Sequence, residues 1–265
     1  MDAGALLDWY DRVRRPLPWR ETRDPYALLV SEVMLQQTQA LRVVPYYEAF
    51  LARFPDAAAL ADAPVRDVLA AWSGLGYNRR ALALQAAARA VTERGWPEDL
   101  TELPGVGPYT AAAVGSFAWD RQVAAVDTNV RRVIERHDGV RRPPGALAAR
   151  ADELLPRRRA ATFNQAMMEL GATVCRPRAP RCDECPVRCG CAGAVAGLAP
   201  ARAARRGGER FEDTDRWARG RVVAALLADE PPPPEIAGER RERVLAGLER
   251  DGLVVRARDG SPRLP

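Results

Sequence analysis

The segment LPGVGPYTAAAVGSFAWDRQVAAVD, residues 103–127, combines a tight turn, a helix of small residues and a terminal carboxylate. Pro104 presets one backbone angle of the turn, and Gly105 and Gly107 permit conformations that are closed to other residues. A helix is predicted over residues 108–119, because its first residue is a proline, which needs no amide hydrogen there. Backbone N–H groups at a helix N-terminus suit a phosphate, although an ordinary turn between helices has the same residues.

The composition of the chain indicates the class of partner and the compartment. At 265 residues the chain can bury a sizeable core, as one large domain or as two or three small ones. Its formal net charge of +5 and its pI near 9.2 favour an anionic partner such as nucleic acid. All 40 basic residues are Arg, so no side-chain amine can form a Schiff base. Neither a signal peptide nor an apolar run of membrane-spanning length is present, and we expect a cytoplasmic protein with no membrane partner.

Apolar periodicity and helix start signals predict a mainly helical chain. Ala-rich faces and short loops favour a compact all-α arrangement. The expected helices cover residues 2–15, 26–39, 44–53, 56–61, 64–72, 79–93, 108–119, 130–137, 146–155, 163–170, 214–227 and 236–251.

Glu32 is the unusual residue of the expected helix 26–39. Three of its four neighbours one turn away along the helix are apolar. A carboxyl group within an apolar stripe would have a raised pKa if it were buried, whereas a side chain at the edge of the stripe would reach solvent. The residues alone leave both alternatives open.

The five cysteines lie between Cys175 and Cys191, which is too clustered for a secreted disulfide framework. Four of them form the pattern Cys175-x6-Cys182-x2-Cys185-x5-Cys191, and four thiolates so close in sequence can surround one metal centre. Structural zinc is the alternative, but zinc modules usually present two close Cys pairs and this pattern has one. Cys189 lies outside the pattern.

Several of these motifs together resemble the helix-hairpin-helix superfamily of DNA glycosylases, which includes endonuclease III and MutY. The turn LPGVGPYT, followed eighteen residues after Tyr109 by Asp127, is similar to the hairpin signature of that superfamily. The spacing of the four cysteines resembles its [4Fe-4S] loop. The strings SEVMLQQTQ (31–39), GLGY (74–77) and FNQAMMELG (163–171) resemble the MutY-type adenine DNA glycosylases more than endonuclease III.

The resemblance covers about residues 5–192 and implies an all-α, two-domain glycosylase fold. Residues 21–124 would form a six-helix barrel-like domain with the helix-hairpin-helix, and residues 1–20 and 125–200 a discontinuous iron-sulfur cluster domain. Residues 201–213 are interpreted as a linker, and residues 214–265 as a small winged-helix-like module of two helices and a hairpin. Full-length MutY proteins carry a larger, NUDIX-like C-terminal domain, so a preference for 8-oxoguanine over guanine stays open.

By resemblance, the chain would hydrolyse the N-glycosidic bond of adenine mispaired with guanine or 8-oxoguanine and leave an abasic site. Glu32 would protonate the adenine and Asp127 would stabilise the positive charge on the sugar, a division of labour like that of glycosidase carboxylates. Tyr109 and Asn129 occupy family positions that support these groups. The residues expected to contact DNA are Arg20, Gln37, Tyr77, Gly105, Val106 and Gly107, and the expected cluster ligands are Cys175, Cys182, Cys185 and Cys191.

Tyr109 also stands where endonuclease III carries its Schiff-base lysine, so the resemblance implies an enzyme without lysine-dependent lyase activity. We expect a monomer that acts on double-stranded DNA in the bacterial cytoplasm, at the nucleoid. Two alternatives remain: a mismatch thymine DNA glycosylase, which also has Tyr at this position, and a non-catalytic helix-hairpin-helix DNA-binding protein.

Overall fold

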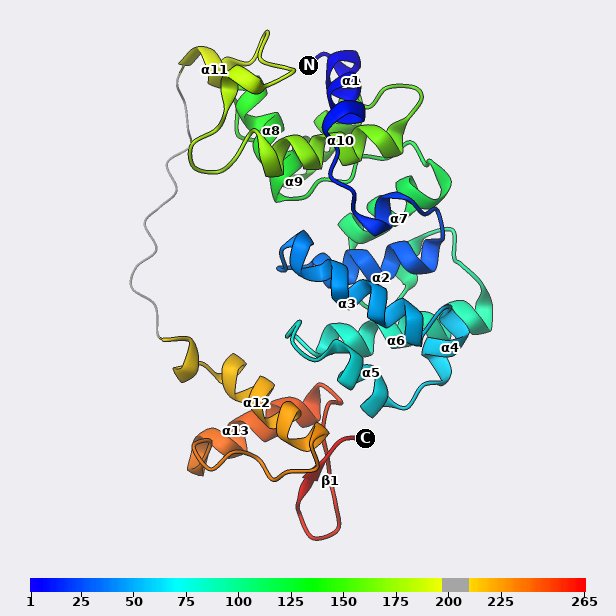
Figure 1. The fold of residues 1–265 in the computed structure, drawn as a ribbon, viewed down its shortest axis with the longest axis vertical. Helices are drawn as coiled ribbons and strands as arrows, with labels where there is room; N and C mark the ends of the chain where they lie inside the picture. Colours follow the sequence, from blue (N-terminus) through cyan, green and yellow to red (C-terminus); the bar gives the residue numbers. More distant parts are fainter. Residues whose placement is uncertain (197–209) are drawn as a thin grey trace. The chain divides into compact units, whose positions relative to one another are not determined.

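The computed structural model describes residues 1–196 and 210–265, and their regular secondary structure is helical apart from one short hairpin (Figure 1). This confirms the expected all-α class. The α-helices are α1 (Ala3–Val13), α2 (Pro25–Leu35), α3 (Ala40–Arg53), α4 (Ala57–Asp62), α5 (Val65–Trp72), α6 (Arg79–Arg94), α7 (Pro108–Trp119), α8 (Thr128–Asp138), α9 (Pro144–Leu154), α10 (Ala160–Thr173), α11 (Ala192–Ala196), α12 (Asp215–Leu227) and α13 (Gly238–Arg250). Short 3-10 turns are η1 (Pro18–Arg20), η2 (Leu100–Glu102), η3 (Cys182–Glu184) and η4 (Phe211–Asp213).

Helix ends follow the local chemistry of the sequence at several places. The helix α7 has the expected bounds and ends where Asp120 takes a left-handed conformation. The helix α2 begins at Pro25, with the Asp24 carboxylate accepting the N–H groups of Tyr26 and Ala27. It ends at Leu35, before the expected residue 39, because the backbone of Gln37 has a φ of 59° and cannot continue a right-handed helix.

The chain folds into two compact units, each assembled from two separate stretches of sequence. The first combines Met1–Leu28 with Gly107–Ala203, and the second combines Leu29–Val106 with Ala204–Pro265. This division into two units does not test the domain boundaries expected from the sequence, which stay a prediction. The expected linker, 201–213, lies outside the described residues as far as residue 209, and its last residues form η4.

The first unit is built around helices α1, α8 and α10, whose apolar faces meet. Leu6 and Tyr10 of α1, Ile134 of α8, and Phe163 and Met167 of α10 are all buried in this core. Small residues of α7 form a second core, which lets helices pack closely at this point. These two cores support the segment that leads to Asp127.

The second unit contains helices α3 to α6, with Phe50 and Trp72 in edge-to-face contact at a centroid distance of 5.9 Å. Its C-terminal part consists of α12 and α13 side by side and an antiparallel pair, β1 (Val255–Arg256) and β2 (Pro262–Arg263), in which Val255 faces Arg263 (Figure 1). We call residues 210–265 the C-terminal module; its likeness to a winged helix stays a prediction.

The C-terminal module is held on the helices of the second unit by ion pairs as well as by packing. The guanidinium of Arg66, on α5, forms two hydrogen bonds to the carboxylate of Asp229, at 2.9 and 2.7 Å, and donates to the carbonyl of Leu227.

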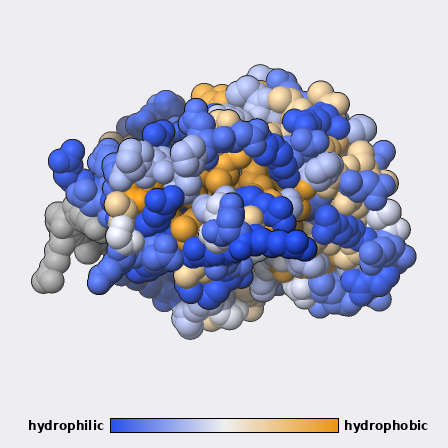
Figure 2. All heavy atoms as spheres, turned by 90° about the horizontal axis from the view of Figure 1, so that it is seen from below, coloured by the Kyte–Doolittle hydropathy of each residue, from blue (hydrophilic) through white to orange (hydrophobic). Residues whose placement is uncertain are grey.

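Hydrophilic residues cover most of the face that Figure 2 shows, in keeping with an arginine-rich surface. No helix in the described parts of the chain is both long enough and apolar enough to cross a lipid bilayer.

Candidate active site and cysteine cavity

The turn at residues 103–107 is anchored by its apolar residues. Leu103 and Val106 are buried, and the N–H of Val106 donates to the carbonyl of Leu103. Gly105 has a φ of 75°, and a Cβ at this position would lie 2.6 Å from the Cβ of Ala83. Glycine is therefore required at this position both by the backbone angle and by the close approach of α6. Gly107 follows as the N-cap residue of α7.

Asp127 is the N-cap residue of α8 and its carboxylate is fixed by three N–H donors. One carboxylate oxygen accepts the backbone N–H groups of Asn129 and Val130, at 2.8 and 2.7 Å. The other oxygen accepts the side-chain amide of Asn129, at 2.7 Å. The half-buried carboxylate thus combines a capping role with a defined orientation, and it is brought together with Asn129 as expected from the sequence.

Arg132 holds Asn129 in place and links it to the cysteine loop. One guanidinium nitrogen donates to the side-chain oxygen of Asn129 at 2.8 Å and to the carbonyl of Gly171 at 2.6 Å. The Nε donates to the carbonyl of Cys175 at 2.7 Å. Because Arg132 occupies the amide oxygen, the amide nitrogen of Asn129 faces Asp127. Arg132 was not expected from the sequence; its position one turn after Asn129 on the same helix was the available signal.

Gly171 and Asn164, both on α10, shape the surroundings of Asp127. A Cβ on Gly171 would lie 2.5 Å from the Cβ of Asn129, so only glycine allows this approach. Asn164 is buried; it accepts the N–H of Ala125 and donates to the carbonyl of Val123, which holds the segment that leads to Asp127. Both residues lie in the string 163–171, which resembles the glycosylase family, but the sequence alone predicts no role for Asn164 or Gly171.

Glu32 is 5% exposed, so the buried alternative holds for this carboxyl group. It lies on α2, between Ser31 and Val33, which are also buried. The helix is apolar almost all round, and that composition, rather than a single stripe, buries Glu32. Glu32 belongs to the second unit and Asp127 to the first.

Gln37 and Tyr77, which are expected to contact DNA, are brought together. The Tyr77 hydroxyl donates to the side-chain oxygen of Gln37 at 2.5 Å. Both residues have left-handed backbones, with φ values of 59° and 50°, a conformation that costs energy outside glycine and clusters at ligand-binding sites. Arg80 ties the two loops together, because it donates to the carbonyls of Gln36 and Gly76.

Tyr109 and Arg20 both belong to the first unit. Tyr109 is half-buried at the start of α7 and packs against the core around Phe117. The side chain of Arg20 is 6% exposed and pairs at 2.7 Å with the buried carboxylate of Glu169, which also accepts two hydrogen bonds from Arg15. Burial raises the pKa of Glu169, but the two guanidinium groups outweigh it and the pKa lies below the usual value. The ion pair gives Arg20 a structural role, and its expected contact with DNA stays a prediction.

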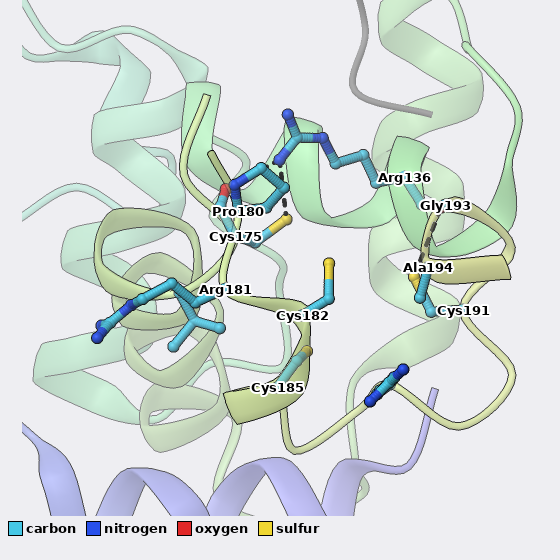
Figure 3. Close-up of a pocket in the computed structure, with 11 residues that line it drawn as sticks. Arg136, Cys175, Pro180, Arg181, Cys182, Cys185, Cys191, Gly193 and Ala194 are labelled. Atoms are coloured by element: carbon cyan, nitrogen blue, oxygen red, sulfur yellow. Dashed lines mark hydrogen bonds between the residues drawn. The ribbon is translucent and has the colours of Figure 1, made fainter. Parts of the chain in front are cut away.

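The four cysteines of the expected ligand set line one cavity of about 230 Å³, beside Arg136 (Figure 3). The Arg136 guanidinium lies 3.4 Å from the sulfur of Cys175 and donates to the carbonyl of Arg176 at 2.7 Å. Burial, with the three neighbouring thiols, raises the pKa of Cys185 to about 11. Cys189 is exposed and does not line the cavity. Across residues 1–196 and 210–265, no three Cys, His, Asp or Glu side chains are arranged to hold a single metal ion.

The comparisons with known proteins agree with this geometry. Residues 30–157 match the family model described as HhH-GPD superfamily base excision DNA repair protein. The adenine DNA glycosylase of Mycobacterium tuberculosis (strain CDC 1551 / Oshkosh) is 43% identical over 281 residues, which cover 98% of this chain and 92% of that protein. The chain belongs to the adenine DNA glycosylase family. The resemblance drawn from the hairpin, the cysteine spacing and the string at residues 31–39 is thereby confirmed at the level of the family.

Two solved structures have a fold similar to that of this adenine DNA glycosylase family member. A thermostable thymine-DNA glycosylase superposes with a TM-score of 0.69 at 32% identity, over 73% of this chain and 95% of that one. Endonuclease III in a trapped covalent complex with DNA superposes with a TM-score of 0.63, over 74% of this chain and 99% of that one. At 20% identity the second likeness concerns the fold alone.

Proposed function

We propose that this chain hydrolyses the N-glycosidic bond of adenine mispaired with guanine or 8-oxoguanine in duplex DNA and leaves an abasic site. The observation that carries the proposal is the 43% identity to a named adenine DNA glycosylase across 98% of the chain. The fixed carboxylate of Asp127 and the buried carboxyl group of Glu32 support it, because this chemistry needs an anion and a proton donor.

The reaction builds positive charge on the sugar and negative charge on the departing base. In the proposal, Asp127 faces the sugar and stabilises the oxocarbenium ion, and Asn129 keeps its carboxylate oriented. Glu32, buried on α2, donates a proton to N7 of the adenine and then positions the attacking water. Tyr109 supports these groups by hydrogen bonding.

The adenine must leave the base stack to reach these groups, at a cost of a few kcal/mol. We assign to Tyr77 the role of entering the duplex beside the mispair and to Gln37 a contact with the partner base. The hydrogen bond between the two side chains and their left-handed backbones support a shared role. The turn with Gly105, Val106 and Gly107 would bind a DNA phosphate through the N–H groups of the two glycines, since the N–H of Val106 donates to Leu103.

A [4Fe-4S] cluster fits the four cysteines that share the cavity, and Cys189 is left out of the ligand set. Burial, with the neighbouring thiols, raises the pKa of Cys185 to about 11, and a bound cluster would supply the positive charge that favours its thiolate. We assign the cluster a structural role, since it would cross-link residues 175–191. The carbonyl of Cys175, the first residue of this loop, accepts a hydrogen bond from Arg132.

We further propose that the enzyme has no lysine-dependent lyase activity, because the chain contains no lysine. It would act as a monomer in the bacterial cytoplasm, at the nucleoid. A likeness of 32% to a thymine-DNA glycosylase makes thymine release from G·T mispairs the second candidate activity.

Base release from 8-oxoguanine·A, G·A and G·T duplexes, measured side by side, tests the proposal. Adenine release from the first two, with strand breaks only after alkali, is the expected result. Release of thymine alone would favour the second candidate. Tight binding of every duplex with no base release would identify a non-catalytic DNA-binding protein.

A further inference from the structure

The ring of Tyr77 is contacted by an arginine of the C-terminal module. The Cζ atom of Arg216, the second residue of α12, lies 4.0 Å from the centroid of the Tyr77 ring. The same guanidinium lies 5.6 Å from the ring of Phe211 in η4. Arg80, from α6, lies 5.5 Å from the Tyr77 centroid. The tyrosine is therefore in contact with two guanidinium groups from distant parts of the sequence.

The chemistry of this cluster favours an anionic and aromatic partner. Arg216 is exposed, and within the described residues no carboxylate forms an ion pair with it. Phe211 is 53% exposed and Tyr77 is 37% exposed, so both rings face solvent. Burial chiefly lowers the pKa of Arg80, and the positive charge of Arg216 lowers it further. Two like charges beside exposed aromatic rings match the phosphates and bases of nucleic acid.

Two ion pairs hold the C-terminal module on the helices that flank Tyr77 in the sequence. The ion pair between Arg66 and Asp229 ties the end of α12 to α5. A second pair, between Arg79 and Asp251 at 3.6 Å, ties the end of α13 to the start of α6, two residues after Tyr77. The two ion pairs therefore hold the C-terminal ends of α12 and α13 on α5 and α6, the two helices between which Tyr77 lies in the sequence.

We propose that the start of the C-terminal module is part of the DNA-binding surface, and that its residues Arg216 and Phe211 contact the duplex beside Tyr77. The proposal rests on the proposed function, in which Tyr77 enters the DNA. A base that stacks on Tyr77 takes the ring face that Arg216 covers, and the released guanidinium then pairs with a neighbouring phosphate. Arg216 thus holds the ring before binding and contacts the DNA afterwards.

Binding of the full chain to a labelled duplex with one G·A mispair, over about 50 to about 200 mM salt, tests the proposal. Arg216→Ala should weaken binding about five- to tenfold and reduce the slope of log affinity against log salt by about one. Arg258→Ala is the matched control, since it removes the same charge from an exposed arginine in the turn between β1 and β2. It should change affinity by less than about twofold.

Equal losses in Arg216→Ala and Arg258→Ala would overturn the proposal, because they would reflect net charge alone. Tighter binding by Arg216→Ala would overturn it too, because Arg216 would then shield Tyr77 from DNA. Arg216→Lys keeps the charge without the planar group, and should retain the salt slope while losing about two- to threefold in affinity. If the alanine variant fails to fold, the lysine variant carries the test.

These binding measurements do not require excision. A wild-type chain that releases no adenine, yet shows the expected difference between Arg216→Ala and Arg258→Ala, would contradict the proposed function and leave the inference standing. If the wild type releases adenine but the two variants bind DNA equally well, the proposed function stands and the inference about Arg216 is contradicted.

Discussion

Replacement of Arg132 by Met should slow adenine release far more than it weakens DNA binding. The methionine keeps the aliphatic stem and removes the guanidinium that holds Asn129, Gly171 and Cys175 at 2.6 to 2.8 Å. Hydrogen bonds from a charged donor contribute about 1.5–3 kcal/mol each, but these three share one group and are not additive.

The catalytic part of this loss comes through Asn129. Without Arg132, the amide of Asn129 is free to rotate, and Asp127 loses the side-chain donor at 2.7 Å for part of the time. A loss of about 1.5–3 kcal/mol from transition-state stabilisation slows the reaction roughly 10- to 100-fold. Since no DNA contact of the proposal is removed, affinity for the mispaired duplex should change by less than about threefold.

Single-turnover adenine release with excess enzyme measures this effect, with affinity measured on the same duplex. Arg131→Met, at an exposed neighbour on α8, is the matched control. Asn129→Ala should lose a similar factor, and the double variant should lose little more than either single one, because both changes break the same link. Visible absorbance of the cluster shows whether the cofactor stays bound.

A wild-type rate in Arg132→Met would refute this reasoning, because Asn129 would then be held without Arg132. A slow rate that recovers fully once the cluster is restored would also refute it, since the loss would then come from the cysteine loop alone.

Three further outcomes follow from other contacts in the structure. Gly105→Ala should destabilise the chain by about 1–3 kcal/mol and weaken DNA binding, because the new Cβ meets Ala83 at 2.6 Å and the φ of 75° is unfavourable; thermal melting and binding assays measure both. The two guanidinium groups lower the pKa of Glu169 in the folded chain. The stabilisation that its ion pairs give the fold is therefore complete at pH values above the ordinary glutamate pKa of about 4.3, and it is lost as the pH falls through and below that value. The melting temperatures of the wild type and Glu169→Gln should therefore differ at neutral pH and converge in acid; a constant difference would contradict the assignment. Cys182→Ser should lose the cluster and Cys189→Ser should keep it, as measured by iron content per chain.

Local signals in the sequence predict much of the first unit. Pro108 and the glycines before it mark the start of α7, and the Asx residue at position 127 caps the next helix. Such features depend on residues close together in the chain, so the pattern contains the information. The bounds of α7 were expected for that reason, and the capping role of Asp127 depends on the same kind of local contact.

Contacts between distant segments could not be predicted in this way. Arg132 meets Cys175 only because α8 and α10 pack together, and Arg216 meets Tyr77 only because the C-terminal module lies on α5. The left-handed backbones at Gln37 and Tyr77 have no local signature, since neither residue is a glycine or an asparagine. These arrangements come from tertiary packing, which overrides local preference.

Single-turnover adenine release by Asp127→Asn, on an 8-oxoguanine·A duplex, tests the central chemistry most directly. Asparagine is also a good N-cap, so α8 should persist while the negative charge is lost. We expect the rate to fall by about a thousandfold or more, equivalent to about 4 kcal/mol, with DNA binding retained. Release at the wild-type rate would contradict the account, because a carboxylate at this position would then not be needed for the reaction.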